Sequence, residues 1–172
     1  RSPKDSYELG IGMVHQHFML VPSLTVAENI ILGVAPKKGL FIDMDKAIKA
    51  AEDIAKEYNF DIDVRQKVEE IPVGIKQKVE ILKALYRGAE ILILDEPTAV
   101  LTPQETDELF IQLMKLREKG HTIIFISHKL DEIKKICDRA TIMRNGRSMG
   151  TYEVKDISTQ EMSRLMVGRE VS

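Results

Sequence analysis

A run of four aliphatic residues that ends in two carboxylates constrains this chain more than any other segment. The run Ile91-Leu92-Ile93-Leu94 is typical of a strand buried on both faces of a parallel sheet. Open α/β sheets bind ligands at the carboxyl ends of their strands, where Asp95 and Glu96 would lie. One carboxylate could hold Mg²⁺ through water while the other polarises a water for attack on a phosphate. The alternative is an apolar strand that runs into an acidic turn, so the other segments must decide.

Strands and helices alternate along the chain, which predicts an α/β fold. A short buried strand is expected over Leu9–Gln16. Apolar residues then recur on one helical face from Asp43 to Asn59, and a further helix is expected over about Gly74–Tyr86. Because this mostly helical stretch lies between two strands, we interpret it as an inserted helical subdomain.

Short local signals mark several element boundaries. A hydroxyl residue followed three positions later by glutamate is a capping box, which predicts helix starts at Thr25, Thr102 and Ser158. Pro103, at a first helical position, supports the second of these starts. The segment Thr122–Ile126 predicts another buried strand, and Asn145-Gly146 is typical of the two-residue turn of a hairpin.

Composition excludes several classes of function. The charge is nearly balanced, with 25 basic and 27 acidic residues, which argues against a nucleic-acid partner. The single cysteine, Cys137, excludes an internal disulfide and a multi-cysteine metal site, and we expect it to face the core from a helix. No apolar run approaches the ~20 residues of a membrane span, and no signal peptide opens the sequence, so a cytoplasmic location is expected.

Polar residues end three of the predicted strands, at Gln16, at Asp95-Glu96 and at Ser127-His128. This order, with a helical insert between the first two, resembles the nucleotide-binding domain of ABC transporters over nearly the whole chain. In that resemblance the family motifs are the Q-loop at Gln16, the signature at Ile71–Ile75, the Walker B strand at Ile91–Glu96, the D-loop at Pro97–Thr102 and the switch histidine at His128. Five matches in family order are specific, whereas any one alone is weak.

Longer stretches resemble the ATPases of simple-sugar and nucleoside importers, in which two nucleotide-binding halves are fused. These stretches are Gly12–Phe18, Leu85–Glu90 and Pro97–Pro103. The ending Leu165–Val171 resembles the close of the first half. The resemblance therefore implies a second half in the parent protein.

The resemblance also implies the fold and its division. It implies a P-loop NTPase-like parallel sheet with an inserted α-helical subdomain and a C-terminal β-hairpin. Residues 1–21 and 88–172 would form a partial ATPase core, and residues 22–87 the helical subdomain with an altered signature.

The resemblance assigns roles to four polar side chains and implies ATP and Mg²⁺ as cofactors. Glu96 would be the general base or water-positioning group, and Asp95 would hold Mg²⁺. Gln16 would join the Mg²⁺ shell, and His128 would contact the γ-phosphate and orient Glu96. The structural alternatives are an acidic turn residue, a helix-capping aspartate, a loop amide and a surface or core histidine, respectively.

The largest departure from the family is the lack of any Gly-x-x-x-x-Gly-Lys-Ser/Thr sequence. In P-loop NTPases the amides of that loop cradle the phosphates and its lysine neutralises them. The family places the loop upstream of Gln16, so the resemblance predicts a truncated domain without its Walker A strand and without ATPase activity of its own. A vacant position in the sheet, between the strands at Thr122–Ile126 and Ala140–Arg144, is expected to follow.

Two further family positions differ. The usual Leu-Ser-Gly-Gly-Gln signature is Ile71-Pro72-Val73-Gly74-Ile75, in which only Gly74 would still face the partner half's nucleotide. Pro72 removes both a hydroxyl and an N–H. Thr102 replaces the usual aspartate at the D-loop position. The site that this signature serves is therefore expected to be weakened.

These features imply the ATP-hydrolysing subunit of an importer for simple sugars or nucleosides. Its partners would be transmembrane permease subunits, the second nucleotide-binding half and, indirectly, a solute-binding protein. It would lie in the cytoplasm, peripheral on the inner face of the cell membrane. Two alternatives stay open: a soluble ABC ATPase outside transport, and a non-enzymatic module in which the helical insert binds a partner.

Overall fold

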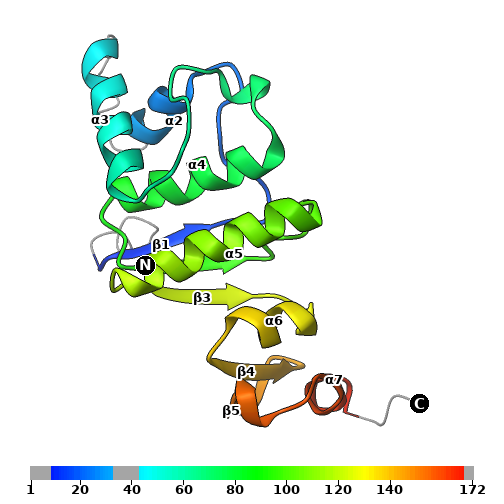
Figure 1. The fold of residues 1–172 in the computed structure, drawn as a ribbon. Coiled ribbons are helices and arrows are strands. Elements are labelled where there is room, and N and C mark those ends of the chain that lie inside the picture. Colours follow the sequence, from blue (N-terminus) through cyan, green and yellow to red (C-terminus); the bar gives the residue numbers. More distant parts are fainter. Residues whose placement is uncertain (1–8, 33–42, 169–172) are drawn as a thin grey trace. The chain divides into compact units, whose positions relative to one another are not determined.

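Figure 1 shows the computed structural model, which describes residues 9–32 and 43–168. The chain divides into two compact units, Arg1–Ile126 and Ser127–Ser172, and each has its own sheet. Strands and helices alternate along the chain, so the predicted α/β fold class is confirmed. The division into a core and a helical subdomain at residues 22–87 remains a proposal.

The first unit contains a parallel sheet of three strands, which lie in the order β1 (Ile11–Val14), β2 (Ile91–Asp95) and β3 (Thr122–Ile126). In its register Val14 pairs with Leu94, and Asp95 pairs with Ile126. Because the strands are parallel and in this register, all three end at the same edge of the sheet.

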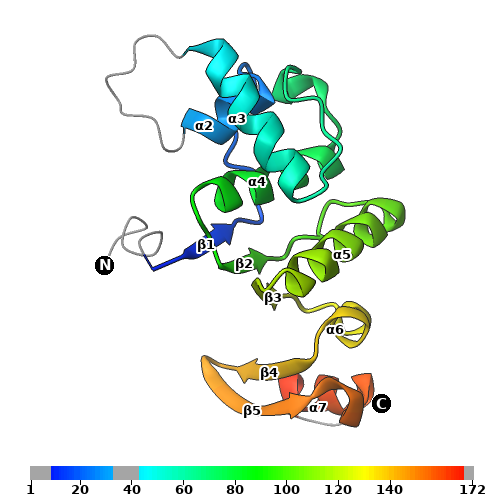
Figure 2. The same ribbon diagram turned by 60° about the vertical axis from the view of Figure 1, so that its left-hand side comes forward.

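Two helices, α4 (Val73–Tyr86) and α5 (Pro103–Glu118), cover one face of this sheet, as Figure 2 shows from the side. Leu94 is fully buried on that face. On the same face, the ring of Phe110 in α5 meets the ring of Phe125 in β3 edge to face, with 5.8 Å between centroids. This packing fixes the position of β2 beneath the helices.

The opposite face of the sheet is only partly covered by the described residues. Met13, Ile124 and Ile126 are 38%, 45% and 44% exposed, respectively. The expectation that Thr122–Ile126 is buried is therefore wrong for the described part of the chain. A parallel strand is buried on both faces only when elements lie on both sides, and α4 and α5 lie on one.

The helices between β1 and β2 pack on one another and are fixed by local capping. The helices α2 (Val26–Leu32) and α3 (Met44–Glu57) contact each other and α4. The predicted capping box of α2 is confirmed, because the amide of Glu28 donates to Oγ1 of Thr25 at 3.1 Å and the amide of Thr25 donates to Oε1 of Glu28 at 3.2 Å. The helix predicted from Asp43 is α3, and Asp43 is its N-cap.

A polar stretch with one 3-10 turn, η1 (Val68–Glu70), leads into α4. The helix α4 matches the helix predicted over about Gly74–Tyr86, and its apolar residues Val79, Leu82 and Leu85 are all buried. The helix α5 begins as predicted, with Thr102 as N-cap, Pro103 at the first position and a complete capping box with Glu105.

The second unit combines an antiparallel hairpin with two short helices. Its elements are α6 (Leu130–Ile136), β4 (Arg139–Arg144), β5 (Arg147–Glu153), the 3-10 turn η2 (Val154–Asp156) and α7 (Thr159–Val167). The predicted hairpin turn is confirmed, because Asn145 and Gly146 have φ of 51° and 74°. The ammonium of Lys134 joins α6 to the connection before α7 by donating to the carbonyls of Val154 and Ile157 at 2.7 and 2.8 Å.

Cys137 is the C-cap of α6 and is half-buried, so the expected place inside a helix is off by one residue. Burial raises the pKa of its thiol to about 11, and Asp138 adds to the shift. The thiol is therefore protonated and unreactive at neutral pH.

Candidate functional site

The carboxyl edge of the parallel sheet brings together three of the predicted site residues. Gln16 lies two positions after β1, Asp95 is the last residue of β2, and Glu96 follows it. Gln16 is exposed, whereas Asp95 and Glu96 are half-buried. Amide and carboxylate oxygens are the ligands that Mg²⁺ accepts from proteins, so this donor set fits the ion that the motifs predict.

Glu96 has an unusual backbone. Its φ is 46°, in the left-handed region that only three non-glycine residues of the described chain adopt. The other two, Asn59 and Asn145, are asparagines, which tolerate this region, whereas a glutamate there costs about 1–3 kcal/mol. The amide of Glu96 donates to the carbonyl of Ile126 at 2.9 Å, which holds the residue against the end of β3. Strain of this kind is typical of functional sites and is a physical reason to place chemistry here.

The remaining predicted catalytic residue, His128, belongs to the second unit. Its side chain is exposed, and the adjacent amide of Lys129 donates to Oγ of Ser127 at 3.0 Å, which shapes the turn before α6. The approach of His128 to Glu96 stays a prediction.

Gly74, the retained residue of the altered signature, and Thr102, at the altered D-loop position, are linked through one carboxylate. The amide of Gly74 donates to Oε2 of Glu105 at 2.6 Å, and the amide of Thr102 donates to Oε1 of the same residue at 3.0 Å. Glu105 was predicted only as a capping residue of α5, so its contact with α4 is an addition. The sequence held one signal for it: Pro72, the N-cap of α4, has no side chain that could accept from the first amides of that helix.

The hydrogen bonds to Glu105 change its titration. The bond from the amide of Thr102 is the largest influence that lowers the pKa of the Glu105 carboxyl, and the bond from Gly74 adds to it. A carboxylate that accepts backbone amides is held in its charged form. The start of α4 is therefore capped by an ionised side chain of α5.

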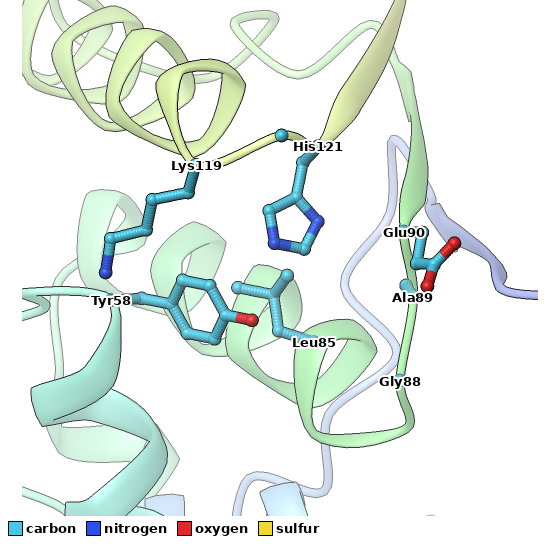
Figure 3. A pocket seen from close by; sticks show the side chains of 8 residues that line it. Tyr58, Leu85, Gly88, Ala89, Glu90, Lys119 and His121 are labelled. Atoms are coloured by element: carbon cyan, nitrogen blue, oxygen red, sulfur yellow. The ribbon is translucent and has the colours of Figure 1, made fainter.

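A cavity of about 350 Å³ lies at the opposite edge of the sheet, before β2 and β3 begin (Figure 3). The rings of Tyr58 and His121 meet there at 5.5 Å, and Nζ of Lys119 lies 5.0 Å from the centre of the Tyr58 ring. Because these residues sit at the amino ends of the strands, the cavity is separate from the edge that carries Asp95. Its aromatic and cationic contacts join the end of α3 to the turn before β3.

Two further features of the described residues bear on the site. Within residues 9–32 and 43–168, no three histidine, cysteine or acidic side chains gather into a group that could hold a metal by themselves. Over the same residues, no helix has both the length and the apolar character that crossing a membrane requires.

Comparison with known proteins identifies the class. Residues 2–99 match the model of the ABC transporter family. The nucleoside import ATP-binding protein NupA of Lactococcus lactis is 51% identical over 171 residues, which cover 99% of this chain and 34% of that protein. The guanosine import ATP-binding protein NupO of Bacillus subtilis is 54% identical, with 99% and 34% covered. The glucose import ATP-binding protein TsgD13 of Haloferax volcanii is 46% identical, with 99% and 36% covered. The chain spans about a third of the length of these relatives.

Solved structures give the same class. A nucleotide-free ATP-binding cassette from an ABC transporter superposes with a TM-score of 0.76 at 24% identity, over 89% of this chain and 64% of that chain. The cbiO1 protein of Clostridium perfringens, part of the ABC transporter complex cbiONQ, gives 0.73 at 28% identity over 90% and 62%. The fold is that of an ATP-binding cassette. The chain belongs to the ABC transporter family.

Proposed function

We propose that this chain is part of the ATP-binding and ATP-hydrolysing subunit of an importer for simple sugars or nucleosides. The observation that carries the proposal is the pair Asp95-Glu96 at the carboxyl edge of the parallel sheet, with Glu96 held in a strained backbone conformation. The relatives that are named as sugar and nucleoside import proteins support the transport assignment over a soluble ABC ATPase outside transport.

The roles follow from the chemistry of phosphoryl transfer to water. Asp95 and Gln16 would hold Mg²⁺ through their oxygens, and the ion would supply positive charge that neutralises the phosphates. Glu96 accepts the proton of the attacking water and orients that water for in-line displacement. The role that the family motif implies for His128 is contact with the γ-phosphate. These residues together supply the metal and water side of the reaction.

The phosphate cradle must come from a sequence that these 172 residues do not contain. Without the amides and the lysine of such a loop, the charge of a triphosphate has no matched partner. We therefore expect the 172-residue chain to lack ATPase activity, while the parent protein hydrolyses ATP. The isolated chain would then act only as an interaction and coupling module.

The partners of the parent protein follow from the same proposal. Permease subunits in the membrane would receive the motion that ATP binding produces, and a solute-binding protein would deliver the sugar or nucleoside to them. A second nucleotide-binding half would complete the ATP sites, with Gly74 and Thr102 of this half facing its nucleotide. The protein would lie on the inner face of the membrane. The charge balance gives no support for a nucleic-acid partner.

The proposal is tested by Glu96→Gln in the parent protein. The variant is expected to bind ATP normally and to lose turnover by ~10²-fold or more, because a positioned base is removed while the shape of the side chain is kept. Equilibrium binding of ATP and release of phosphate are measured side by side. Loss of nucleotide affinity with normal turnover at saturation would show that the assigned role is wrong.

The same measurements on the 172-residue chain separate an enzyme from an interaction module. We expect neither turnover nor tight ATP binding. Turnover that co-purifies with this chain and disappears in Glu96→Gln would contradict the expectation.

A further inference from the structure

The helix α4 carries a buried carboxylate that the mechanism does not use. Glu80 is 5% exposed, and its sequence neighbours Val79 and Ile81 are fully buried. Placing a carboxylate in such surroundings is unfavourable unless it is hydrogen-bonded. Burial raises the pKa of Glu80, and the neighbours that oppose the shift are Lys83, the amide of Met19, His15 and Arg87.

The partner of Glu80 is the loop that follows Gln16. Its Oε1 accepts a hydrogen bond of 2.6 Å from the amide of Met19, a residue 61 positions away in the sequence. Lys83 lies three positions after Glu80 on the same face of α4, and its ammonium donates to the carbonyl of Met19 at 3.0 Å. Two side chains of one helix therefore bind both backbone polar groups of a single loop residue.

Met19 is held by these bonds and not by burial of its own side chain. Met19 is 60% exposed, and Val21 is 48% exposed. A second backbone anchor comes from Asn29 in α2, which accepts from the amide of Val21 at 2.7 Å and donates to its carbonyl at 3.1 Å. Gln16 lies between the paired end of β1 and the first of these anchors. Its position is therefore set at one side by the sheet and at the other by Glu80 and Lys83.

We propose that Glu80 and Lys83 are positioning residues that fix the backbone of Met19 and, through it, the approach of Gln16 to the metal and nucleotide. Only the effect on Gln16 rests on the function proposed above; the contact of Glu80 and Lys83 with Met19 does not. Neither side chain touches the reacting atoms. The bonds to the loop explain why a carboxylate occupies a position of α4 whose sequence neighbours are apolar.

The first test measures amide hydrogen exchange at Met19 in the 172-residue chain, without nucleotide. Glu80→Leu keeps the buried volume but removes the acceptor, so exchange at Met19 should become about tenfold faster relative to global unfolding. Glu80→Gln keeps an oxygen at the acceptor position and should restore most of the protection. Leu82→Ala, a buried position of the same helix, is the control that lowers stability without a selective change at Met19. Equal exchange at Met19 in Glu80→Leu and the wild type would show that Glu80 does not fix the backbone of Met19.

The second test measures the Mg²⁺ dependence of ATP hydrolysis in the parent protein. Glu80→Leu should raise the Mg²⁺ concentration at half-maximal rate by about tenfold, the usual effect of losing a group that orients a ligand. Glu80→Gln should restore most of the affinity for the ion. Because Glu80 acts through Gln16, the double variant Glu80→Leu with Gln16→Ala should be no worse than Gln16→Ala alone. Fully additive effects would overturn the link to Gln16.

The two tests keep failure of the inference apart from failure of the proposed function. If the parent protein shows no Mg²⁺-dependent turnover, or if Glu96→Gln does not abolish that turnover, the proposed function is wrong. The link from Glu80 to Gln16 is then overturned with it. Amide exchange at Met19 is measured without nucleotide. It therefore tests whether Glu80 fixes the backbone of Met19, whether or not the proposed function is correct.

Discussion

The amide of Gly74, in the first turn of α4, donates a hydrogen bond of 2.6 Å to Oε2 of Glu105, in the first turn of α5. The other oxygen of the same carboxylate closes the capping box of α5 by accepting from Thr102. One side chain therefore stabilises the start of two helices. Lys78 and Glu108, whose charged atoms lie 3.5 Å apart, form a second link between the same helices.

The contact between Gly74 and Glu105 predicts an effect of Gly74→Ala that depends on residue 105. A Cβ at Gly74 would overlap the carboxyl group of Glu105, which would have to move and give up its bond. We expect Gly74→Ala to lower the free energy of unfolding by about 1 kcal/mol. In a Glu105→Ala background the same change should raise it by about 0.5–1 kcal/mol, because alanine is the better helix former. Denaturant unfolding of the four proteins checks this, and the same sign in both backgrounds would contradict it.

The titration of Glu105 predicts a pH dependence. The pKa of its carboxyl in the folded protein lies below the ordinary value of 4.5, chiefly because Thr102 donates to it. The stability that this provides is present above the unfolded pKa and is lost as the pH falls through the folded pKa. The wild type should therefore be more stable than Glu105→Gln at neutral pH, and the difference should shrink below about pH 4.5. A difference that is constant between neutral and acidic pH would contradict the prediction.

A buried amide on α4 predicts a stabilising substitution. Gln77 is 3% exposed, and its Nε2 has no hydrogen-bond partner within the part of the chain that the structure describes. Gln77→Met keeps the length of the side chain and removes the unsatisfied donor, so the free energy of unfolding should rise by about 1 kcal/mol. The matched control is Asn29→Leu. Asn29 is also buried but donates and accepts several bonds, so the control should lose about 2 kcal/mol or more.

The left-handed backbone of Glu96 predicts that a substitution which relieves its strain will raise stability but remove activity. Glycine adopts a φ of 46° without strain, so Glu96→Gly should raise the free energy of unfolding by about 1 kcal/mol in the 172-residue chain. The same change should abolish turnover in the parent protein. Asn145→Gly is the control, because asparagine already tolerates the left-handed region and the gain should be smaller. A less stable Glu96→Gly variant would show that the side chain contributes more than the strain costs.

The N-cap of α4 predicts a gain of both stability and activity. Pro72 makes no side-chain cap, whereas a serine there could accept from the first amides of the helix. Pro72→Ser should add about 1 kcal/mol in the 172-residue chain. Combined with Ile75→Gln in the parent protein, it should also raise the ATPase rate. Pro103→Ser is the control, since Pro103 already occupies a favourable first helical position. An unchanged rate would mean that the altered signature serves an idle site.

The features that could be predicted from the sequence are helix caps and turns, which are formed by residues close together in the chain. The capping boxes at Thr25 and Thr102 and the hairpin at Asn145 each involve residues only a few positions apart, and all three are present. Of the box predicted at Ser158, the serine cap is present, because Oγ of Ser158 accepts from the amide of Glu161, whereas the Glu161 carboxylate accepts from Arg164. The bond between Glu80 and Met19 joins residues 61 positions apart. No local pattern reports such a contact, because a buried carboxylate has no periodic signature of its own.

The candidate site also has some features that the sequence predicts and others that it does not. The aliphatic run before Asp95 predicts a strand and places two carboxylates at its end, because strand direction alone fixes that edge. The left-handed φ of Glu96 could not be predicted, since glutamate has no preference for it. The exposure of Ile124 escaped prediction for another reason: apolar composition does not tell how many elements will cover a strand.

The half-covered parallel sheet governs how this chain behaves in concentrated solution. Ile124 and Ile126 offer an aliphatic surface, and among the described residues β3 pairs with a neighbour on one side only. An edge of this kind is a template on which another chain can add a strand. Near the isoelectric point of about 6.1 the molecules hardly repel one another, so light scattering should rise most steeply with concentration at that pH. We therefore expect self-association through this strand edge to limit the concentration at which the chain stays monomeric.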